Sequence, residues 1–191
     1  MRKILLTLSV LLVLVLALAM TACGGTTETT TEAVTTTTEA PITTEAPLPE
    51  GYTLYDNGDI SFAYPESFVK TDGSTVILTN VINGNNITVV YEAKTDMYET
   101  LDNNGYKELF KPMFESMGIS VSKYNVEQVA QNTKGISLTK ITHTASVQGK
   151  SMEQTMLITT VGNKTYTVTI TEVVNDDVYL NNVMNSLGLS K

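Results

Sequence analysis

Residues 165–173, TYTVTITEV, alternate polar and apolar side chains with the period of two that belongs to a β-strand. Tyr166, Val168 and Ile170 fall on one face, and threonines occupy the other. Threonine, β-branched and aromatic residues are enriched in strands because they pack well on a pleated surface. The stretch therefore predicts one strand of a half-covered antiparallel sheet, with one face against a core and the other toward solvent.

Runs of the same kind extend on the N-terminal side of this strand. They lie at residues 75–79, 86–91, 119–126, 136–147 and 151–161. Gly149 and Gly162-Asn163 separate the last three strands at hairpin spacing, and Asn83-Gly84 marks an earlier turn. Two shorter runs between residues 52 and 65 flank Asn57-Gly58, which predicts a tight hairpin because both central residues tolerate positive φ.

Two segments follow the helical period instead. The first places apolar residues at i, i+3, i+4, i+7, i+8 and i+11, namely Tyr106, Leu109, Phe110, Met113, Phe114 and Met117. Gly118 ends this helix, and Pro112 predicts a kink or a solvent-side irregularity in it. The second helix begins after Asn175-Asp176-Asp177, a natural N-cap cluster, and ends at Gly188. Its apolar residues are Tyr179, Leu180, Val183, Met184 and Leu187.

The order strands, helix, strands, helix over residues 51–191 predicts one α+β domain, an antiparallel β-sheet covered by a middle helix and a C-terminal helix. About 141 residues suffice for one domain with its own core. The motif Gly58-Asp59-Ile60-Ser61-Phe62-Ala63-Tyr64-Pro65, with this element order and a last helix ending Met184-Asn185-Ser186-Leu187, resembles PsbP-like domains. That superfamily includes the photosystem II extrinsic subunit and DcrB-like bacterial lipoproteins. The resemblance implies a PsbP-like fold and an accessory or binding role.

The N-terminal residues have the layout of an exported lipoprotein. Arg2 and Lys3 precede an apolar run from residue 4 to residue 19, as in a secretory signal peptide. The run leads to Met20-Thr21-Ala22-Cys23, which resembles a bacterial lipobox with Met where the pattern usually has Leu. The resemblance implies that residues 1–22 are removed and that Cys23 becomes an N-terminus carrying diacylglyceryl and palmitate chains. The protein is then anchored in the cell membrane, on the extracytoplasmic face of the cell envelope.

Two other interpretations of this segment remain open. A plain secretory signal would be cut near Ala22 and would leave Cys23 as a free thiol. A retained membrane anchor would need about 18 to 20 apolar residues and a stop-transfer signal, and no basic cluster follows the run here. Because Cys23 is the only cysteine, it cannot form an internal disulfide, and lipidation is the interpretation that gives it a role.

Residues 24–50 are dominated by threonine, with Thr-Glu-Ala repeated three times, five glutamates and no basic residue. Such a segment has almost nothing apolar to bury, so it cannot offset the entropy cost of ordering itself. Residues 23–50 are therefore predicted to be the lipid attachment site and a disordered tether with an r.m.s. span of about 30 Å. An O-glycosylated stalk is the alternative, because Thr- and Pro-rich tracts accept glycans.

Without residues 1–22, the chain has 10 basic and 20 acidic groups and a net charge of −10. Every basic residue is then a lysine, and the lysines do not cluster. Binding to phosphate backbones requires concentrated positive charge, so the composition argues against nucleic acid as a partner. The expected partners are the membrane, through the lipid on Cys23, and an envelope protein or a small ligand.

Candidate catalytic or metal-binding residues are scarce. His143 is the only histidine and shares a strand face with apolar residues, so a partly buried sheet position competes with a general base or a metal ligand. Asp56-Asn57-Gly58-Asp59 superficially resembles a calcium loop, but its twelfth position is Ser67, and the hairpin explains it. Asp176-Asp177 is better interpreted as a helix cap than as a metal site.

The sequence shows no nucleophile elbow, no phosphate-binding glycine loop and no pattern that favours a catalytic triad. We therefore expect no catalytic residue, metal or cofactor, and predict a membrane-anchored lipoprotein with a non-catalytic binding or accessory domain. A structural envelope protein without a specific ligand is one alternative. A hydrolase that uses His143 or paired carboxylates is another, because carboxylates that converge in space are invisible in one sequence. A solute-binding protein is disfavoured, since one compact domain lacks the two-lobed clamp.

Overall fold

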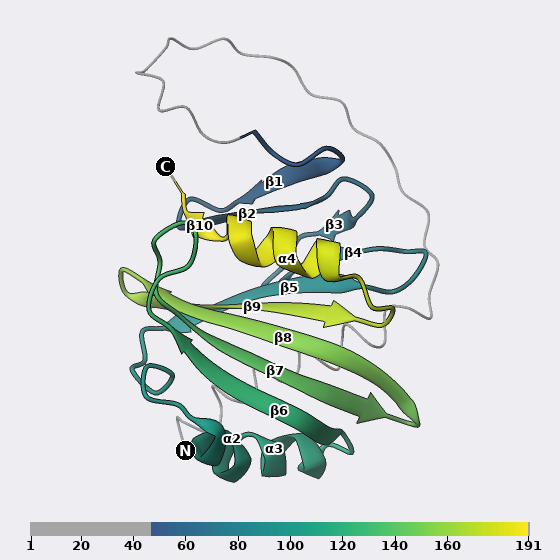
Figure 1. The fold of residues 1–191 in the computed structure, drawn as a ribbon, viewed down its shortest axis with the longest axis vertical. Coiled ribbons are helices and arrows are strands. Elements are labelled where there is room, and N and C mark those ends of the chain that lie inside the picture. Colours follow the sequence, from purple (N-terminus) through teal and green to yellow (C-terminus); the bar gives the residue numbers. More distant parts are fainter. Residues whose placement is uncertain (1–46, 191) are drawn as a thin grey trace.

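The computed structural model describes residues 47–190. The predicted signal peptide, the predicted lipidation site Cys23 and nearly all of the predicted tether lie outside these residues. The described part contains ten strands and three helices (Figure 1). The strands are β1 Tyr52–Asp56, β2 Ile60–Pro65, β3 Val69–Thr71, β4 Val76–Thr79, β5 Asn86–Ala93, β6 Ser120–Val129, β7 Leu138–Val147, β8 Lys150–Val161, β9 Lys164–Glu172 and β10 Gly188–Leu189. The helices are α2 Asn103–Leu109, α3 Lys111–Ser116 and α4 Asp177–Ser186.

Seven strands form one sheet in the order β3-β4-β5-β9-β8-β7-β6, with every neighbouring pair antiparallel. Two-residue turns join β7 to β8 and β8 to β9, since Val147 pairs with Lys150 and Val161 with Lys164. Gln148 and Gly149 have φ of 50° and 79°, a left-handed turn whose twist matches that of the flanking strands. The glycine turns that the sequence predicted therefore set the register at the centre of the sheet.

β1, β2 and β10 form a second, three-stranded sheet, which packs with α4 over one face of the larger sheet (Figure 1). The core between them contains Phe62 from β2, Ile87 from β5, Val168 from β9 and Val183 from α4. Tyr166 and Ile170 belong to the same core, so the apolar face predicted for this strand is confirmed.

A second core lies between the helices α2 and α3 and the β6–β8 part of the large sheet (Figure 1). Met156 and Ile158 of β8 belong to this core, whereas Leu157 between them belongs to the first. A strand that is buried on both faces has apolar residues at consecutive positions. The run Met156-Leu157-Ile158 therefore contributes to both cores from one segment of β8.

The predicted middle helix is two short helices. α2 ends at Leu109, Phe110 forms the junction, and Pro112 lies in the first turn of α3. Proline has no N–H to donate and fixes φ, so it is tolerated at a helix N-terminus but not in a helix interior. The irregularity predicted at Pro112 is thus confirmed as a helix boundary. The boundary also interrupts the helical repeat, and Leu109, predicted on the apolar stripe, is exposed.

The β1–β2 hairpin is confirmed, but its turn differs from the prediction. The last strand pair is Asp56 with Ser61, and of Asn57 and Gly58 only the glycine has positive φ. The Asn57 Oδ1 atom instead accepts the backbone N–H groups of Asp59 and Ile60, at 3.1 and 3.0 Å. Asparagine therefore acts here as a side-chain acceptor that closes a wider turn.

The threonine face of β9 also differs from the prediction. All four threonines, from Thr165 to Thr171, are buried rather than solvent-facing. The Thr171 hydroxyl accepts a hydrogen bond from Nε2 of Gln154 at 3.0 Å, and the Thr165 hydroxyl accepts one from the Thr95 N–H at 3.1 Å. β9 is the central strand of the seven, so a half-covered sheet is the wrong description of this position.

Both edges of the large sheet are short or irregular. β3, at one edge, has three residues. At the other edge the pairing of β6 with β7 shifts register between Ser122 and Asn125, and Lys123 within the shift has a φ of 49°. The shift is a β-bulge, which bends an edge strand away from regular pairing.

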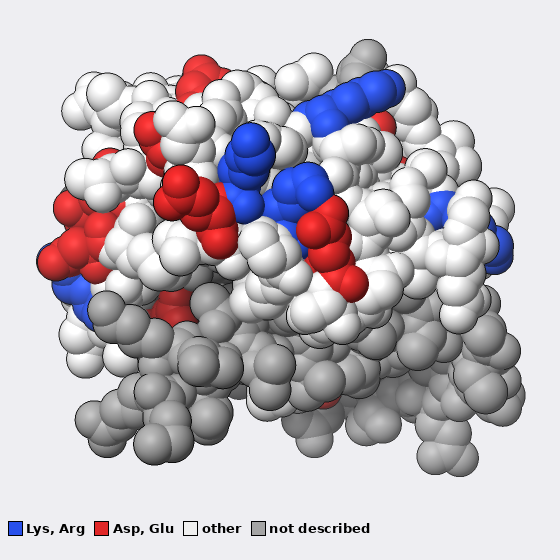
Figure 2. Space-filling model, turned by 90° about the horizontal axis from the view of Figure 1, so that it is seen from below, with Lys and Arg blue, Asp and Glu red and all other residues white. Residues whose placement is uncertain are grey.

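Seen from the α2–α3 side, basic and acidic side chains are interspersed, and no broad basic area is visible on this face (Figure 2). On α3 the Lys111 ammonium contacts the Glu115 carboxylate one turn away. Within residues 47–190, no helix combines the length and the apolar composition needed to cross a membrane.

Candidate functional site

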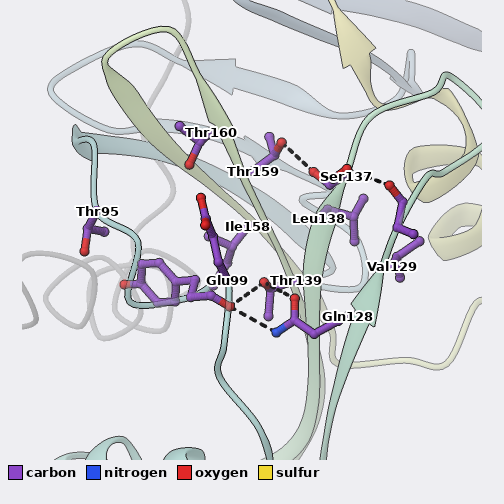
Figure 3. A pocket seen from close by; sticks show the side chains of 12 residues that line it. Thr95, Glu99, Gln128, Val129, Ser137, Leu138, Thr139, Ile158, Thr159 and Thr160 are labelled. Carbon is purple, nitrogen blue, oxygen red and sulfur yellow. Dashed lines mark hydrogen bonds between the residues drawn. The ribbon is translucent and has the colours of Figure 1, made fainter.

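The described domain contains a cleft with a volume of about 480 Å³, a size that suits a small ligand. It lies where segment 95–99 passes the ends of β6, β7 and β8, and its lining includes Tyr98, Glu99, Leu138 and Ile158 (Figure 3). Ligand sites of this size usually present a few convergent polar groups on an apolar wall. The polar groups of the wall therefore decide what the cleft can bind.

Most of these polar groups already have partners within the protein. The Gln128 Nε2 atom donates to the carbonyl oxygens of Tyr98, at 3.0 Å, and of Leu101, at 2.8 Å. The Thr139 hydroxyl lies 2.8 Å from the same Tyr98 carbonyl and 2.9 Å from Gln128 Oε1. Figure 3 shows the Gln128 and Thr139 side chains pointing toward one another in the wall of the cleft. These hydrogen bonds hold segment 98–101 against the sheet. The wall of the cleft therefore has few hydrogen-bond donors left for a ligand.

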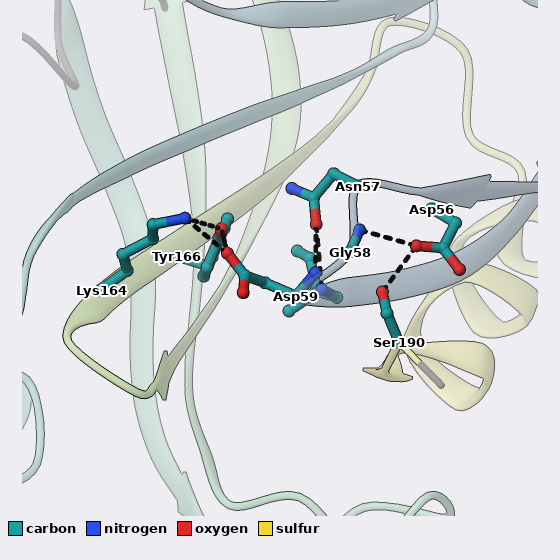
Figure 4. Close-up of polar contacts among 8 residues, drawn as sticks. Asp56, Asn57, Gly58, Asp59, Lys164, Tyr166 and Ser190 are labelled. Atoms are coloured by element: carbon teal, nitrogen blue, oxygen red, sulfur yellow. Dashed lines mark hydrogen bonds and ion pairs between the residues drawn. The ribbon is translucent and has the colours of Figure 1, made fainter.

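A polar cluster joins the two sheets at the opposite side of the β8–β9 hairpin (Figure 4). The Lys164 Nζ atom lies 2.6 Å from Asp59 Oδ2, and the Tyr166 hydroxyl donates to the same oxygen. The Lys164 ammonium also lies 4.9 Å from the ring centroid of Tyr91, which is exposed. The ion pair therefore links Lys164 of the β8–β9 hairpin to the β1–β2 hairpin, and the cation–π contact links it to β5.

The electrostatics of this cluster are those of an ion pair. The hydrogen bond from Lys164 lowers the pKa of the Asp59 carboxyl, and the bond to Asp59 raises the pKa of the Lys164 ammonium. Both groups are then charged at neutral pH, and neither is poised to exchange a proton. The cluster is better suited to holding the β1–β2 hairpin on the large sheet than to acid–base chemistry.

The calcium interpretation of residues 56–59 gains no support from the geometry. The Asp56 carboxylate accepts the Gly58 N–H at 2.8 Å and the Ser190 hydroxyl at 2.7 Å, while Asp59 faces the lysine (Figure 4). Calcium needs six or more oxygen ligands directed at one point. Residues 47–190 contain no group of three or more His, Asp or Glu side chains arranged to hold a metal ion.

His143 lies on β7 inside the second core, with 1% of its surface exposed. Its Nε2 atom is 3.0 Å from Gln154 Oε1, and the rings of Phe114 and Tyr106 lie 5.3 and 5.9 Å from its own. Burial lowers the pKa of the imidazole to about 4, so it is neutral at pH 7. Its Nδ1 atom has no hydrogen-bond partner in the described part of the chain. The histidine is a core residue, more deeply buried than the sequence predicted.

The helix cap predicted at residues 176–177 is confirmed. Asp176 is the N-cap of α4, and its Oδ1 atom accepts the Tyr179 N–H at 3.1 Å. The sequence did not single out several amide side chains that connect separate elements of this domain, among them Asn85, Gln128 and Gln154. Each bonds to groups that are distant in the sequence, so no local motif marks it.

No protein-family model matches the chain, and no curated protein matches it in sequence. The chain is similar to the solution structure of cyanobacterial PsbP (CyanoP) from Synechocystis sp. PCC 6803, with a TM-score of 0.55 and 13% identity over 73% of this chain and 93% of that one. A crystal structure from Bacteroides thetaiotaomicron VPI-5482 has a TM-score of 0.41 and 14% identity, over 69% of this chain and 45% of that one. At such identity the first likeness shows a fold and no function. The described domain has the PsbP-like α+β fold that its element order and its opening motif predicted.

Proposed function

We propose that this protein is a lipid-anchored lipoprotein of the extracytoplasmic membrane face whose PsbP-like domain acts by binding and not by catalysis. The observation that carries the proposal is the lipobox-like sequence Met20-Thr21-Ala22-Cys23 behind a basic and then apolar segment. The PsbP-like fold fits an accessory domain of this kind.

The chemistry of the described residues supports the binding role. Catalysis by a side chain requires an accessible group whose pKa suits proton or electron-pair transfer, plus groups that stabilise developing charge. His143 is buried among aromatic rings, and Asp59 is held as a charged partner of Lys164. The polar wall of the cleft is engaged in holding segment 98–101.

Replacement of Cys23 by Ala tests the anchoring. We expect the variant to stay unprocessed or to leave the membrane, because a diacylglyceryl group supplies the two acyl chains that stable anchoring requires. Membrane fractionation and intact mass of the mature protein report the outcome.

A matched control is Met20→Leu, which restores the usual lipobox residue. This variant should be lipidated and retained at least as well as the wild type. Normal cleavage and full membrane retention of Cys23→Ala would overturn the lipoprotein proposal.

A further inference from the structure

Two neighbouring loops at one end of the domain expose aliphatic side chains. Loop 80–85, between β4 and β5, carries Val81 and Ile82, which are 74% and 91% exposed. The connection from β9 to α4 and the first turn of α4 carry three more exposed valines, Val173, Val174 and Val178. We call these five side chains the apolar end surface. Figure 1 shows both loops at the same end of the large sheet.

Asn85 binds the two loops into one unit. Its Nδ2 atom donates to the Val174 carbonyl at 2.9 Å, and its Oδ1 atom accepts the N–H groups of Val173 and Val174 at 2.9 and 3.0 Å. The asparagine itself is buried. A buried amide with all these partners holds both loops in fixed positions, so the exposure of the valines is built into the fold.

Loop 80–85 is also closed on itself. The Asn80 carbonyl accepts the Gly84 N–H at 2.9 Å, and the Asn80 Oδ1 atom accepts the Ile82 N–H at 2.9 Å. These bonds keep Val81 and Ile82 at the tip of the loop, away from the core. Exposing two adjacent aliphatic side chains to water is unfavourable, and covering them with an apolar phase lowers the free energy.

The start of the described domain is connected to this surface through β2, the segment after it, and α4. The Gly51 carbonyl accepts the Glu66 N–H at 2.9 Å, and Phe68, two residues further on, lies 5.2 Å from the ring of Tyr179. Tyr179 follows Val178, and its hydroxyl donates to the carbonyl of Asn86, the residue after loop 80–85. A short series of contacts therefore connects the start of β1 with residues that adjoin the apolar end surface.

We infer that the apolar end surface docks on the lipid bilayer in which the acyl chains of Cys23 are anchored. The inference rests on the proposed function. The surface is aliphatic and lacks the Trp, Tyr and Arg that dominate the energetics of protein interfaces. A tether of 27 residues holds the domain at a high effective concentration over the membrane, so a weak apolar attraction suffices.

Charge distinguishes this docking from binding to anionic lipid. Segments 80–85 and 173–175 contain no charged residue. Two carboxylates flank the second segment: Glu172 is buried and accepts the Asp176 N–H at 3.0 Å, and Asp176 caps α4. We expect insertion to be driven by apolar contact, to be strongest in phosphatidylcholine, and to weaken when anionic lipid is added at low salt.

The test uses the lipidated full-length protein in phosphatidylcholine vesicles. Lipidation blocks the Cys23 thiol, so a cysteine introduced as Ile82→Cys is the only site for a polarity-sensitive fluorophore. Leu109→Cys is the matched control, because Leu109 is also an exposed aliphatic residue but lies on α2. We expect a blue-shifted emission for the probe at 82, and quenching by brominated acyl chains at least threefold stronger than at 109.

Equal emission and equal quenching at the two positions would overturn the docking. Burial of the probe at 82 only after envelope proteins are added would overturn it as well, in favour of a protein partner. If the intact mass of the mature protein shows that Cys23 carries no lipid, the lipoprotein proposal fails, and the docking inference needs its own test. The docking is then tested separately, by flotation of a Cys23→Ala chain beginning at residue 23 with a large excess of the same vesicles, which compensates for the missing anchor. Ile82→Asp should lower its binding at least threefold and Leu109→Asp should not, and equal flotation would refute the docking alone.

Discussion

His143 is the residue whose environment has the clearest consequence for stability. Its imidazole is enclosed by the rings of Tyr106 and Phe114, and within residues 47–190 its one hydrogen-bond partner is Gln154. Burial lowers the pKa of the imidazole to about 4, and it outweighs the Gln154 hydrogen bond and the Glu153 charge, which both favour protonation. A neutral histidine is thus part of the folded state at neutral pH.

The pH dependence of stability follows from this shift. The unfolded chain protonates His143 below about pH 6.5, whereas the folded protein resists protonation down to about pH 4. The unfolded state therefore binds more protons between these values, and up to about 3 kcal/mol of stability is lost as the pH falls through that window. Urea unfolding at pH 7 and at pH 4.5 measures the change.

Carboxylates also titrate near pH 4, so the contribution of the histidine to the pH dependence has to be measured with variants. His143→Gln removes the imidazole and should show a smaller loss between the two pH values than the wild type. Asp59→Asn is a control that keeps the histidine, and it should retain the wild-type contribution from His143. An identical pH dependence in wild type and His143→Gln would contradict the assignment.

At the scale of the element, α4 depends on one side chain at its start. The Asp176 carboxylate accepts the Tyr179 N–H, and an N-cap aspartate stabilises the first turn both by this bond and by its charge near the helix dipole. We expect Asp176→Ala to cost about 1 kcal/mol and to lower the melting temperature by about 4 °C. Thermal unfolding followed by circular dichroism measures it.

Asp72→Ala is the matched control for this change. It also removes an exposed aspartate, but one whose described contact is a surface ion pair with Lys70 at 3.0 Å. Such pairs contribute little, so its melting temperature should stay within about 1 °C of the wild type. A loss as large as that of Asp176→Ala would mean that net charge, and not capping, explains the effect.

The elements differ in how far the sequence determines them. β8 and β9 were predicted within one or two residues because glycine turns bound long alternating runs. β3 and β10, with three and two residues, escaped prediction, since pairing with β4 and β2 defines them and no local pattern does. The candidate site was less predictable still. The roles of Gln128 and Asn85 depend on carbonyl groups 27 and 89 residues away.

At the scale of the whole molecule, the sequence predicts that a flexible tether precedes an independently folded domain. The tether contains five glutamates and no lysine or arginine. A glutamate-specific protease should therefore remove it quickly and leave a resistant core that begins near Gly51, whereas trypsin should leave the tether on. Intact mass of the products identifies the cut sites.

Urea-unfolded protein serves as the control for this digestion, because every glutamate is then accessible. Slow cleavage of the native tether, or amide exchange protection between Thr26 and Thr44, would show that this segment is ordered and that the tether prediction is wrong.

The edges of the large sheet bear on the behaviour of many copies held in one plane. Regular edge strands can hydrogen-bond to those of a neighbouring molecule and grow into continuous sheets, a risk that rises with crowding. Here one edge offers three residues, and the other is bent at Lys123 and carries a positive charge at the bend. The large sheet therefore offers a neighbouring molecule little regular edge to pair with, so we expect its edges to oppose the growth of continuous sheets between molecules.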